Sequence, residues 1–391
     1  MRQALLATAA LLFLLATAAC HTAPEVVTTP AEPAPDHPLH HITAAECGAC
    51  HEQIYREWQG SMHAQANPLN DPIHGAMYRR MVGDPTQEGV TQGGGPPHCP
   101  ACHVVAAALD GTSKLDAQPV YLDGVTCTTC HTLTGRTAGG ESRGVHSYTR
   151  SADRLQGPRL AGSAAARFPM ERRGAWLASP EFCLGCHGHH TNKQGVAVCR
   201  TGDEAAHGGA APCQACHMAV RDGHADHSML GGHSNAMVAR AATVEVTARR
   251  AGGGVEARVT LRSRVAHAFP TGAPFRMGLL NVVGLDSGGR EVWRSAPGKG
   301  HGEDGHLMVR LTDDAGRPAP PPKATRIAVD TRLAPGEVRE VTYHLPKTVV
   351  RVRARLLYRL VPPAMATKLG DRLPAELKRP KLVAEAVAAV E

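Results

Sequence analysis

Hydrophobic residues are distributed differently in the first and second parts of this 391-residue chain. Near the start, a stripe of side chains recurs at three- and four-residue intervals, which is the spacing of one face of an α-helix. The stripe consists of Cys47, Cys50, His51, Ile54, Trp58 and Met62. Thr43 and Glu46 have the spacing of a capping box, so a single helix is predicted to begin there and to carry the whole stripe.

Beyond residue 240, apolar residues alternate with polar ones or form short β-branched runs, a pattern typical of strands. The segments predicted to be strands are 244–247, 255–262, 278–286, 326–329, 337–343 and 350–357. Strands at this spacing predict an all-β, immunoglobulin-like sandwich. In the last segment Arg351, Arg353 and Arg355 alternate with apolar residues, so one sheet face is expected to be cationic.

Residues 4–19 form an apolar run, rich in alanine and leucine, that follows Met1 and Arg2. The run is short for a membrane span and has the character of a secretory signal peptide. The chain contains no run of 18 or more apolar residues, which excludes a bundle of membrane-spanning helices. We therefore expect an exported protein, either periplasmic or associated with the outer membrane or cell surface.

Cys20 comes directly after two alanines and is placed like the lipidated cysteine of a bacterial lipoprotein. Cleavage at an ordinary A-x-A site, residues 16–18, is the alternative. Residues 21–38 then contain five prolines, a composition that favours an extended tether. Both alternatives predict export, one with a lipid anchor to the membrane and one without.

The composition indicates that something other than aromatic side chains fills the interior. Phe, Trp and Tyr make up only 4% of the residues, whereas cysteine occurs 12 times and histidine 23 times. The hydrophobic fraction of 42% is below that of an ordinary soluble domain. A formal net charge of +7 is nevertheless too small for a wholly disordered chain.

Ten of the cysteines belong to five copies of C-x-x-C-H. The copies are Cys47/Cys50/His51, Cys99/Cys102/His103, Cys127/Cys130/His131, Cys183/Cys186/His187 and Cys213/Cys216/His217. Two thiols one helical turn apart can each form a thioether with a haem vinyl group, and the next imidazole then meets the iron. Zinc sites and disulfides are the alternatives, but neither requires a histidine after every pair. The sequence therefore predicts five covalently bound c-type haems.

All five motifs lie within residues 47–217, so the haems are expected to touch one another. They would then form the core of an α-helical, loop-rich multihaem cytochrome domain. Long and short steps alternate between successive motifs. The two short steps predict closely packed haem pairs at 99/127 and 183/213.

Each iron also has a distal position, and many histidines remain to fill the five of them. His63 lies 12 residues beyond His51, roughly 18 Å along a continuous helix, so it cannot bind the same iron and would serve another haem. The candidates for the distal positions are His63, His146, His227, His233 and His267. Weaker candidates are His74, His207 and His224.

Charge is unevenly distributed along the chain. Residues 240–391 carry 26 lysines and arginines against 15 acidic residues, whereas the part before them is net acidic. This asymmetry favours two regions that attract each other, or a basic face directed at an anionic partner. No nucleic-acid-binding motif accompanies the basic part, so we expect no nucleic-acid partner.

The stretch CGACHEQIYREWQGSMHAQA (47–66) resembles the start of the tetrahaem cytochromes c that accept electrons from hydroxylamine oxidoreductase. CPACH (99–103), GVTCTTCH (124–131) and CLGCH (183–187) are similar to the later motifs of that family in order and rough spacing. The resemblance implies that His63 and His146 are distal ligands and that one haem is five-coordinate.

Two features lie outside the tetrahaem pattern. The fifth motif, CQACHM (213–218), resembles the last haem motif of larger multihaem cytochromes. The segment RVAHAFPTGAPFR (264–276) resembles a part of the β-domains that are appended to such proteins. This second resemblance implies that His267 is a ligand or a docking residue.

The expected organisation is a signal peptide (1–19), a Pro-rich tether (20–42), a pentahaem cytochrome c domain (43–239) and a β-sandwich domain (240–391). The expected function is electron relay between redox protein partners, such as other cytochromes or quinol-linked membrane complexes, by an electron-transfer protein rather than an enzyme. One alternative is an oxidoreductase that acts on a small nitrogen or sulfur compound at a five-coordinate haem. Another is a structural subunit of a cell-surface cytochrome assembly, in which the chain would be part of an oligomer.

Overall fold

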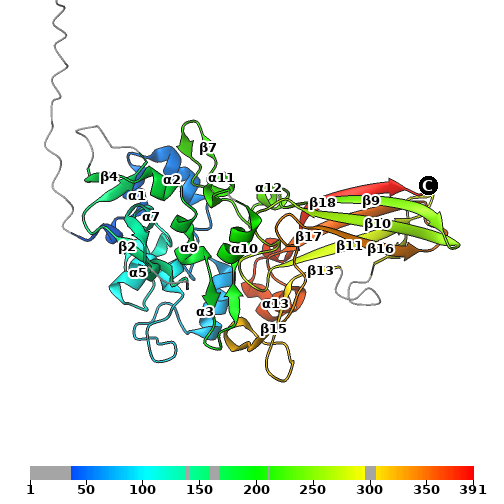
Figure 1. Ribbon diagram of the computed structural model, residues 1–391. Coiled ribbons are helices and arrows are strands. Elements are labelled where there is room, and N and C mark those ends of the chain that lie inside the picture. Colours follow the sequence, from blue (N-terminus) through cyan, green and yellow to red (C-terminus); the bar gives the residue numbers. More distant parts are fainter. Residues whose placement is uncertain (1–36, 138–140, 159–166, 210, 296–304) are drawn as a thin grey trace, which may run out of the picture.

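The computed structural model describes residues 37–137, 141–158, 167–209, 211–295 and 305–391 (Figure 1). The helices lie together at one end of the molecule and the long strands at the other, with α10 near the junction (Figure 1). The predicted signal peptide, Cys20 and most of the predicted tether lie outside the described residues.

The N-terminal region consists of short elements, and its longest described helix, α3, has 10 residues. In order they are η1 (Leu39–His41), α1 (Ala44–Gly48), α2 (Glu52–Gln59), α3 (Pro72–Met81), α4 (Pro100–His103), α5 (Val105–Asp110), α6 (Pro119–Leu122), α7 (Cys127–His131), β1 (Leu133–Arg136), η2 (Gly144–Ser147), β2 (Tyr148–Arg150), β3 (Leu155–Gly157), β4 (Met170–Arg172), α8 (Gly174–Leu177), α9 (Glu181–His187), β5 (His190–Thr191), β6 (Ala197–Cys199), α10 (Thr201–Gly208), α11 (Cys213–His217), β7 (Val220–Arg221), β8 (His224–Ala225) and α12 (Asn235–Val238).

The first helix is interrupted where the sequence predicts continuity. The capping box of Thr43 and Glu46 is present, which confirms the predicted start. The backbone then leaves the helical region at His51 (φ −116°, ψ 50°), so the stripe is divided between α1 and α2. Trp58 on α2 is buried, and its Nε1–H donates to the Val125 carbonyl at 2.8 Å, which fixes α2 beside the third motif.

The last residues of the predicted tether are docked on the N-terminal region. Leu39 and Ile42 are buried, and between them lies the short 3₁₀ helix η1. Burial of these two side chains removes apolar surface from water and so holds the segment in place. The extended conformation that the prolines favour is therefore interrupted at residues 39–41, which form η1.

The C-terminal region is rich in long strands. Its elements are β9 (Ala242–Ala251), β10 (Gly254–Ser263), β11 (Met277–Leu285), β12 (Glu291–Arg294), β13 (His306–Leu307), β14 (Val309–Thr312), η3 (Pro321–Lys323), β15 (Arg326–Asp330), β16 (Val338–Leu345), β17 (Arg351–Arg359), α13 (Pro363–Leu369), η4 (Gly370–Arg372), α14 (Ala375–Lys378) and β18 (Lys381–Ala389). Five of the six predicted strand segments largely coincide with β10, β11, β15, β16 and β17, and the sixth lies within β9.

Two antiparallel sheets share one core in this region. One sheet has the order β16–β10–β9, and the other has the order β12–β11–β17–β18 with β13 beside β11. Alternate residues of β10 and β17 are buried, as expected for strands with one face toward a core. Val259, Leu280 and Leu356 belong to the same buried cluster, so side chains of both sheets pack together.

The cationic face predicted for residues 350–357 lies on β17, a strand paired on both sides. Arg351 is exposed, whereas Arg353 and Arg355 are partly covered. The Arg355 guanidinium forms an ion pair with Glu385 of β18, which offsets part of the positive charge. Among the described residues, no helix combines the length and the apolar character that crossing a membrane requires.

The shared core yields a first prediction. Leu356→Ala removes a fully buried side chain of β17 and is expected to destabilise the C-terminal region by about 2–5 kcal/mol. Leu382→Ala on the adjacent β18 is the matched control, because Leu382 is half exposed and its truncation leaves no cavity. The measurement is the urea midpoint followed by far-UV circular dichroism. Equal shifts for the two variants would contradict a core shared between the sheets.

Candidate functional site

The five C-x-x-C-H motifs lie on short helices or at their ends. Four of them are contained in α4 with its N-cap, α7, α9 and α11, and each of these helices ends at the motif histidine. The first motif spans the break between α1 and α2. In the four helical motifs the paired cysteines are one turn apart, so both thiols face the same side of the backbone.

Thiols of different motifs lie near enough to change one another's pKa. Cys127 lowers the pKa of Cys47, Cys186 that of Cys102, and Cys183 that of Cys213. The contact between the fourth and fifth motifs agrees with the pair predicted at 183/213. For the pair predicted at 99/127, the neighbouring thiols instead join the second motif to the fourth and the third to the first. The packing of the haems at 99/127 stays a prediction.

The motif cysteines are unequally covered by the protein. Cys50 and Cys216, the second cysteines of the first and fifth motifs, are exposed, whereas the other eight are partly buried. The expectation that the five motifs share one core formed by haems stays a prediction. Thioether bonds at these two cysteines remain a prediction from the motif.

Four motif histidines each have the ring of a second histidine close by. The ring centroids are 4.1 Å apart for His74 and His103, 6.4 Å for His131 and His227, 6.0 Å for His63 and His187, and 6.4 Å for His217 and His267. The two residues of each pair come from different elements that are well separated in the sequence. Tertiary folding rather than local structure thus produces these pairs.

The separations fit a metal ion between the rings. A metal–imidazole bond is about 2 Å long and the ring nitrogen lies about 1 Å from the ring centre, so two imidazoles on opposite sides of one iron have centroids roughly 6 Å apart. Three of the four pairs have this separation. The pair of His74 and His103 is shorter, and its rings would have to move apart by about 2 Å to hold an iron.

In five of these eight imidazoles, the ring nitrogen Nδ1 is hydrogen-bonded to a backbone carbonyl. Nδ1 of His131 donates to the Gln156 carbonyl at 2.7 Å, and Nδ1 of His217 donates to that of Leu230 at 2.6 Å. The same bond is formed by His74 to Ala66 O, His227 to Ala225 O and His267 to Ala268 O. A carbonyl can only accept, so Nδ1 carries the proton and Nε2 keeps a lone pair for a metal.

Burial keeps several of these rings neutral. It lowers the pKa of His63 to about 4, and His187 beside it acts in the same direction. Burial also lowers the pKa of His103, His131 and His187. Neutral imidazole is the form that binds a metal, so the protonation state of the cluster suits a haem iron.

Comparisons with known proteins agree with this geometry. The family described as cytochrome c554 and c-prime matches residues 46–132. A crystal structure of a penta-heme cytochrome c552 from Thermochromatium tepidum is 40% identical, with a TM-score of 0.83, and the match covers 90% of this chain and 99% of that one. The chain belongs to the multihaem c-type cytochromes. Covalently bound c-type haems follow from that membership.

Two further comparisons add nothing to this assignment. The putative ApaA protein from Bordetella pertussis is 16% identical, with a TM-score of 0.18, and the match covers 38% of this chain and 93% of that one. Among curated proteins, none matches the sequence of this cytochrome.

The distal candidates differ in where the cytochrome places them. His63, His227 and His267 each lie beside a motif histidine. His146 is exposed on η2, and His233 is partly buried next to Asp71, Arg276 and Lys381. Neither has a ring pair with a motif histidine among the described residues.

His74 is only a weaker candidate on the sequence, yet it lies closest to a motif histidine. It is on α3, where Asp71 caps the helix and Pro72 occupies the first turn. The buried residues Ile73 and Ala76 hold α3 against the neighbouring structure. Asp71 and Pro72 are sequence signals from which a helix that carries His74 could be predicted. The contact of His74 with His103 depends on tertiary folding and could not be predicted in this way.

The C-terminal region contributes directly to the fifth motif. Its residue His267 lies beside His217, in a turn held by Glu204 of α10. Glu204 accepts from the Ala268 amide at 3.3 Å and from Thr271 Oγ1 at 2.5 Å, and it forms an ion pair with Arg332 at 2.7 Å. At Gly208 a Cβ atom would lie 1.9 Å from the Ala266 carbonyl oxygen, so this close approach requires glycine.

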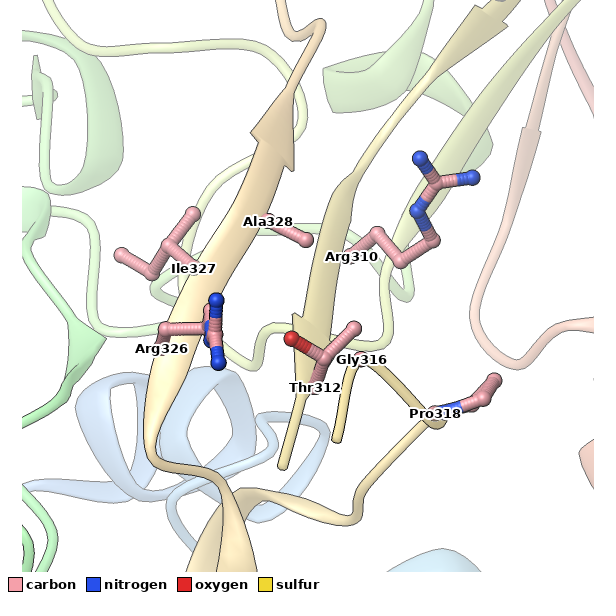
Figure 2. Close-up of a pocket in the computed structure, with 7 residues that line it drawn as sticks. All are labelled: Arg310, Thr312, Gly316, Pro318, Arg326, Ile327 and Ala328. Atoms are coloured by element: carbon pink, nitrogen blue, oxygen red, sulfur yellow. The ribbon is translucent and has the colours of Figure 1, made fainter. Parts of the chain in front are cut away.

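A shallow depression of about 440 Å³ lies on the β14–β15 hairpin (Figure 2). Figure 2 shows Arg310, Thr312 and Arg326 among its lining side chains. The lining contains no histidine, cysteine or carboxylate, and none of its residues belongs to a haem motif. We therefore place the functional site at the histidine pairs.

The contacts of Glu204 yield a second prediction. Glu204→Ala removes the acceptor for Ala268 and Thr271 and one of the two carboxylates paired with Arg332, while Asp330 stays paired with it, so the junction is expected to be destabilised by about 1–3 kcal/mol. Hydrogen exchange of residues 264–271 should accelerate, and the thermal midpoint should fall. Glu340→Ala, which breaks an exposed ion pair with Arg258, is the control and should change stability by less than about 1 kcal/mol. Unchanged exchange in Glu204→Ala would show that this carboxylate does not hold the turn.

Proposed function

We propose that this protein is an exported pentahaem c-type cytochrome that relays electrons through closely packed haems. The observation that carries the proposal is the set of histidine ring pairs, which join distant segments at the separation that an iron requires. Five motifs in the sequence and the likeness to a penta-heme cytochrome c552 support a count of five haems. Each bound haem would supply an iron that changes between the ferric and ferrous states.

The ring pairs suggest an assignment of the axial ligands. His103 would share an iron with His74, His131 with His227, His187 with His63, and His217 with His267. The backbone carbonyls that accept from Nδ1 would orient five of these eight rings. Ligation by two histidines would hold the reduction potentials lower than ligation by histidine and methionine.

Contacts between motifs suggest the order of the relay. The thiol of Cys47 in the first motif neighbours that of Cys127 in the third, and Cys183 of the fourth motif neighbours Cys213 of the fifth. Cys102 of the second motif neighbours Cys186 of the fourth. These neighbours support three links, first to third, second to fourth and fourth to fifth, and in the relay that we propose electrons also pass between the third and fourth motifs.

The first and fifth motifs, which are the two ends of the proposed relay, would face different surroundings. The first motif lies beside the region that follows residue 36, whereas the fifth lies against the C-terminal region. We propose that the C-terminal region is an immunoglobulin-like sandwich that docks a redox partner, because its two sheets share a core and its sequence is strongly basic. The apolar residues 4–19 support export, with Cys20 as the candidate lipid anchor.

The third prediction tests the ligand assignment and the relay. In His267→Met, the iron bound by His217 is expected to exchange imidazole for a thioether, which raises its potential by on the order of 0.1 V. A spectroelectrochemical titration should show about one fifth of the haem absorbance moving to higher potential, with the charge-transfer band of a methionine-bound ferric haem.

Wild-type protein matured in a host that assembles cytochromes c should have a mass greater than its polypeptide by five haem groups. The mass of His267→Met should also exceed that of its own polypeptide by five haem groups. This result separates a ligand change from loss of a haem. His344→Met on β16, an exposed position in the C-terminal region, is the control and should leave the titration unchanged. A titration that is also unchanged in His267→Met would show that His267 is not a ligand.

One observation favours a second function, an oxidoreductase that acts on a small nitrogen compound at one open haem. His51 is exposed and, within the described residues, no histidine ring is paired with it. The iron bound by His51 would then have a free sixth position that a small molecule can occupy.

The fourth prediction separates the two functions. If the first haem is open, the ferric protein should show a high-spin electron paramagnetic resonance signal that changes when nitrite or hydroxylamine is added. If all five haems have two ligands, only low-spin signals should appear. In that case His146→Ala and His233→Ala should be compared, because the variant that creates a high-spin signal identifies the missing ligand.

A further inference from the structure

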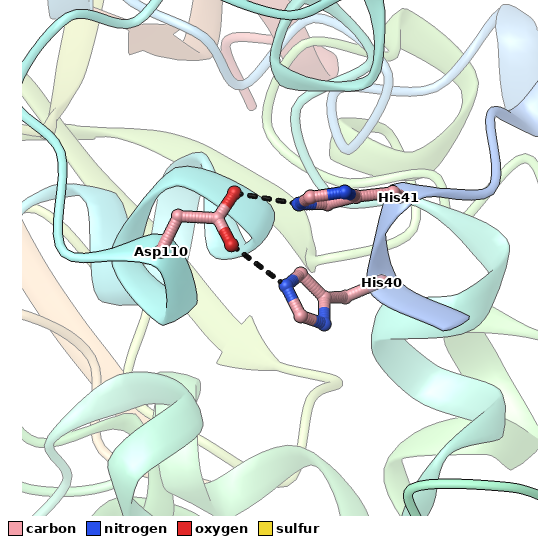
Figure 3. Close-up of side chains that lie close together, drawn as sticks. All are labelled: His40, His41 and Asp110. Carbon is pink, nitrogen blue, oxygen red and sulfur yellow. Dashed lines mark hydrogen bonds and ion pairs between the residues drawn. The ribbon is translucent and has the colours of Figure 1, made fainter. Parts of the chain in front are cut away.

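Two consecutive histidines and one aspartate form a cluster away from the histidine ring pairs. His40 and His41 belong to η1, and Asp110 is the last residue of α5. Figure 3 shows both imidazoles directed at the same carboxylate, one toward each oxygen. His40 Nε2 is 2.9 Å from Oδ1, and His41 Nε2 is 2.7 Å from Oδ2.

We propose that His40, His41 and Asp110 bind a divalent transition metal ion of the zinc class, which fastens the N-terminal segment to the haem region. Two imidazole nitrogens and a carboxylate oxygen are ligands that zinc prefers in proteins. The site is independent of the haem ligands and of the relay proposed above.

The distances in the cluster are close to those of a metal site. Potential ligand atoms of the three residues all lie within 4.8 Å of one another. Around a zinc ion with bonds of about 2.1 Å, neighbouring ligand atoms are roughly 3.0–3.4 Å apart. The present N···O separations of 2.9 and 2.7 Å would therefore widen by a few tenths of an ångström, and ligand atoms that are up to 4.8 Å apart would move closer by about 1 Å.

The surroundings hold the three ligands in place. The Tyr121 hydroxyl donates to Oδ2 of Asp110, so the carboxylate is oriented by a group that is not itself among the proposed ligands. Leu39 and Ile42 are buried on either side of the two histidines, which fixes the backbone of η1. The imidazoles and the carboxylate themselves are about one-fifth exposed, so an ion can enter from solvent.

The site would close a long loop of the chain. His40 is 70 residues from Asp110, and the first two haem motifs lie between them. A metal that joins the two ends reduces the conformational freedom of everything between them in the unfolded state. It would also connect the segment that follows residue 36 to α5, which comes directly after the second motif helix α4. The structural consequence is a metal clip at the base of the N-terminal segment.

The fifth prediction tests this clip on the mature cytochrome. After treatment with EDTA and dialysis, the wild type is expected to bind one zinc ion for every five haem irons, measured by elemental analysis and by isothermal titration calorimetry. Zinc affinity should fall at least tenfold in His40→Gln, in His41→Gln and in Asp110→Asn. Zinc should also slow proteolytic cleavage of residues 37–46 in the wild type but not in Asp110→Asn.

Controls distinguish loss of the site from loss of the fold. Asp110→Asn keeps one carbonyl acceptor but puts an amide donor in place of the other oxygen, so its thermal midpoint in EDTA should fall modestly and should not rise when zinc is added, whereas zinc should raise the midpoint of the wild type. His344→Gln changes an exposed histidine elsewhere and should bind zinc like the wild type. Zinc binding that persists in the double variant His40→Gln/His41→Gln, or that is absent from the wild type, would overturn the proposal and leave a hydrogen-bonded cluster only.

Discussion

The hydrogen bond from a histidine Nδ1 to a backbone carbonyl is the interaction on which the arrangement of this cytochrome depends. It fixes both the direction of the ring and the nitrogen that remains available, and His131 and His217 show it with bonds of 2.7 and 2.6 Å. Because the acceptors are backbone atoms, the orientation of each ring is determined by the local course of the chain. Aromatic residues make up only 4% of the chain, so few large flat side chains are available for the interior. Haems would supply flat apolar surface in their place.

The ring pairs also explain how short elements form one stable unit. Helices of four to ten residues are marginal by themselves, and the buried apolar side chains of the described N-terminal region form small clusters. Each ring pair connects segments that are far apart in the sequence, such as His63 with His187. The tertiary links thus replace the continuous core that the C-terminal region has between its two sheets.

Local features of this chain could be predicted from the sequence, and long-range ones could not. The capping box at Thr43 and the motif helices follow from neighbouring residues, and so do the strands with alternating burial. The break at His51 and the partner of His74 depend on segments that approach only in the folded chain. β18 escapes prediction because its alanine-rich sequence has little strand propensity, and pairing with β17 decides its conformation.

The position of His267 has a consequence for how the site of the fifth motif can respond to force. Its ring comes from the C-terminal region, whereas the other three ring pairs lie within residues 63–227. Separation of the two regions at the seam between α10 and the turn of Thr271 would withdraw this one imidazole and spare the rest. Under the proposed ligand assignment, a partner that pulls on the sheets would remove one ligand from the haem of the fifth motif and leave the other three ring pairs in place.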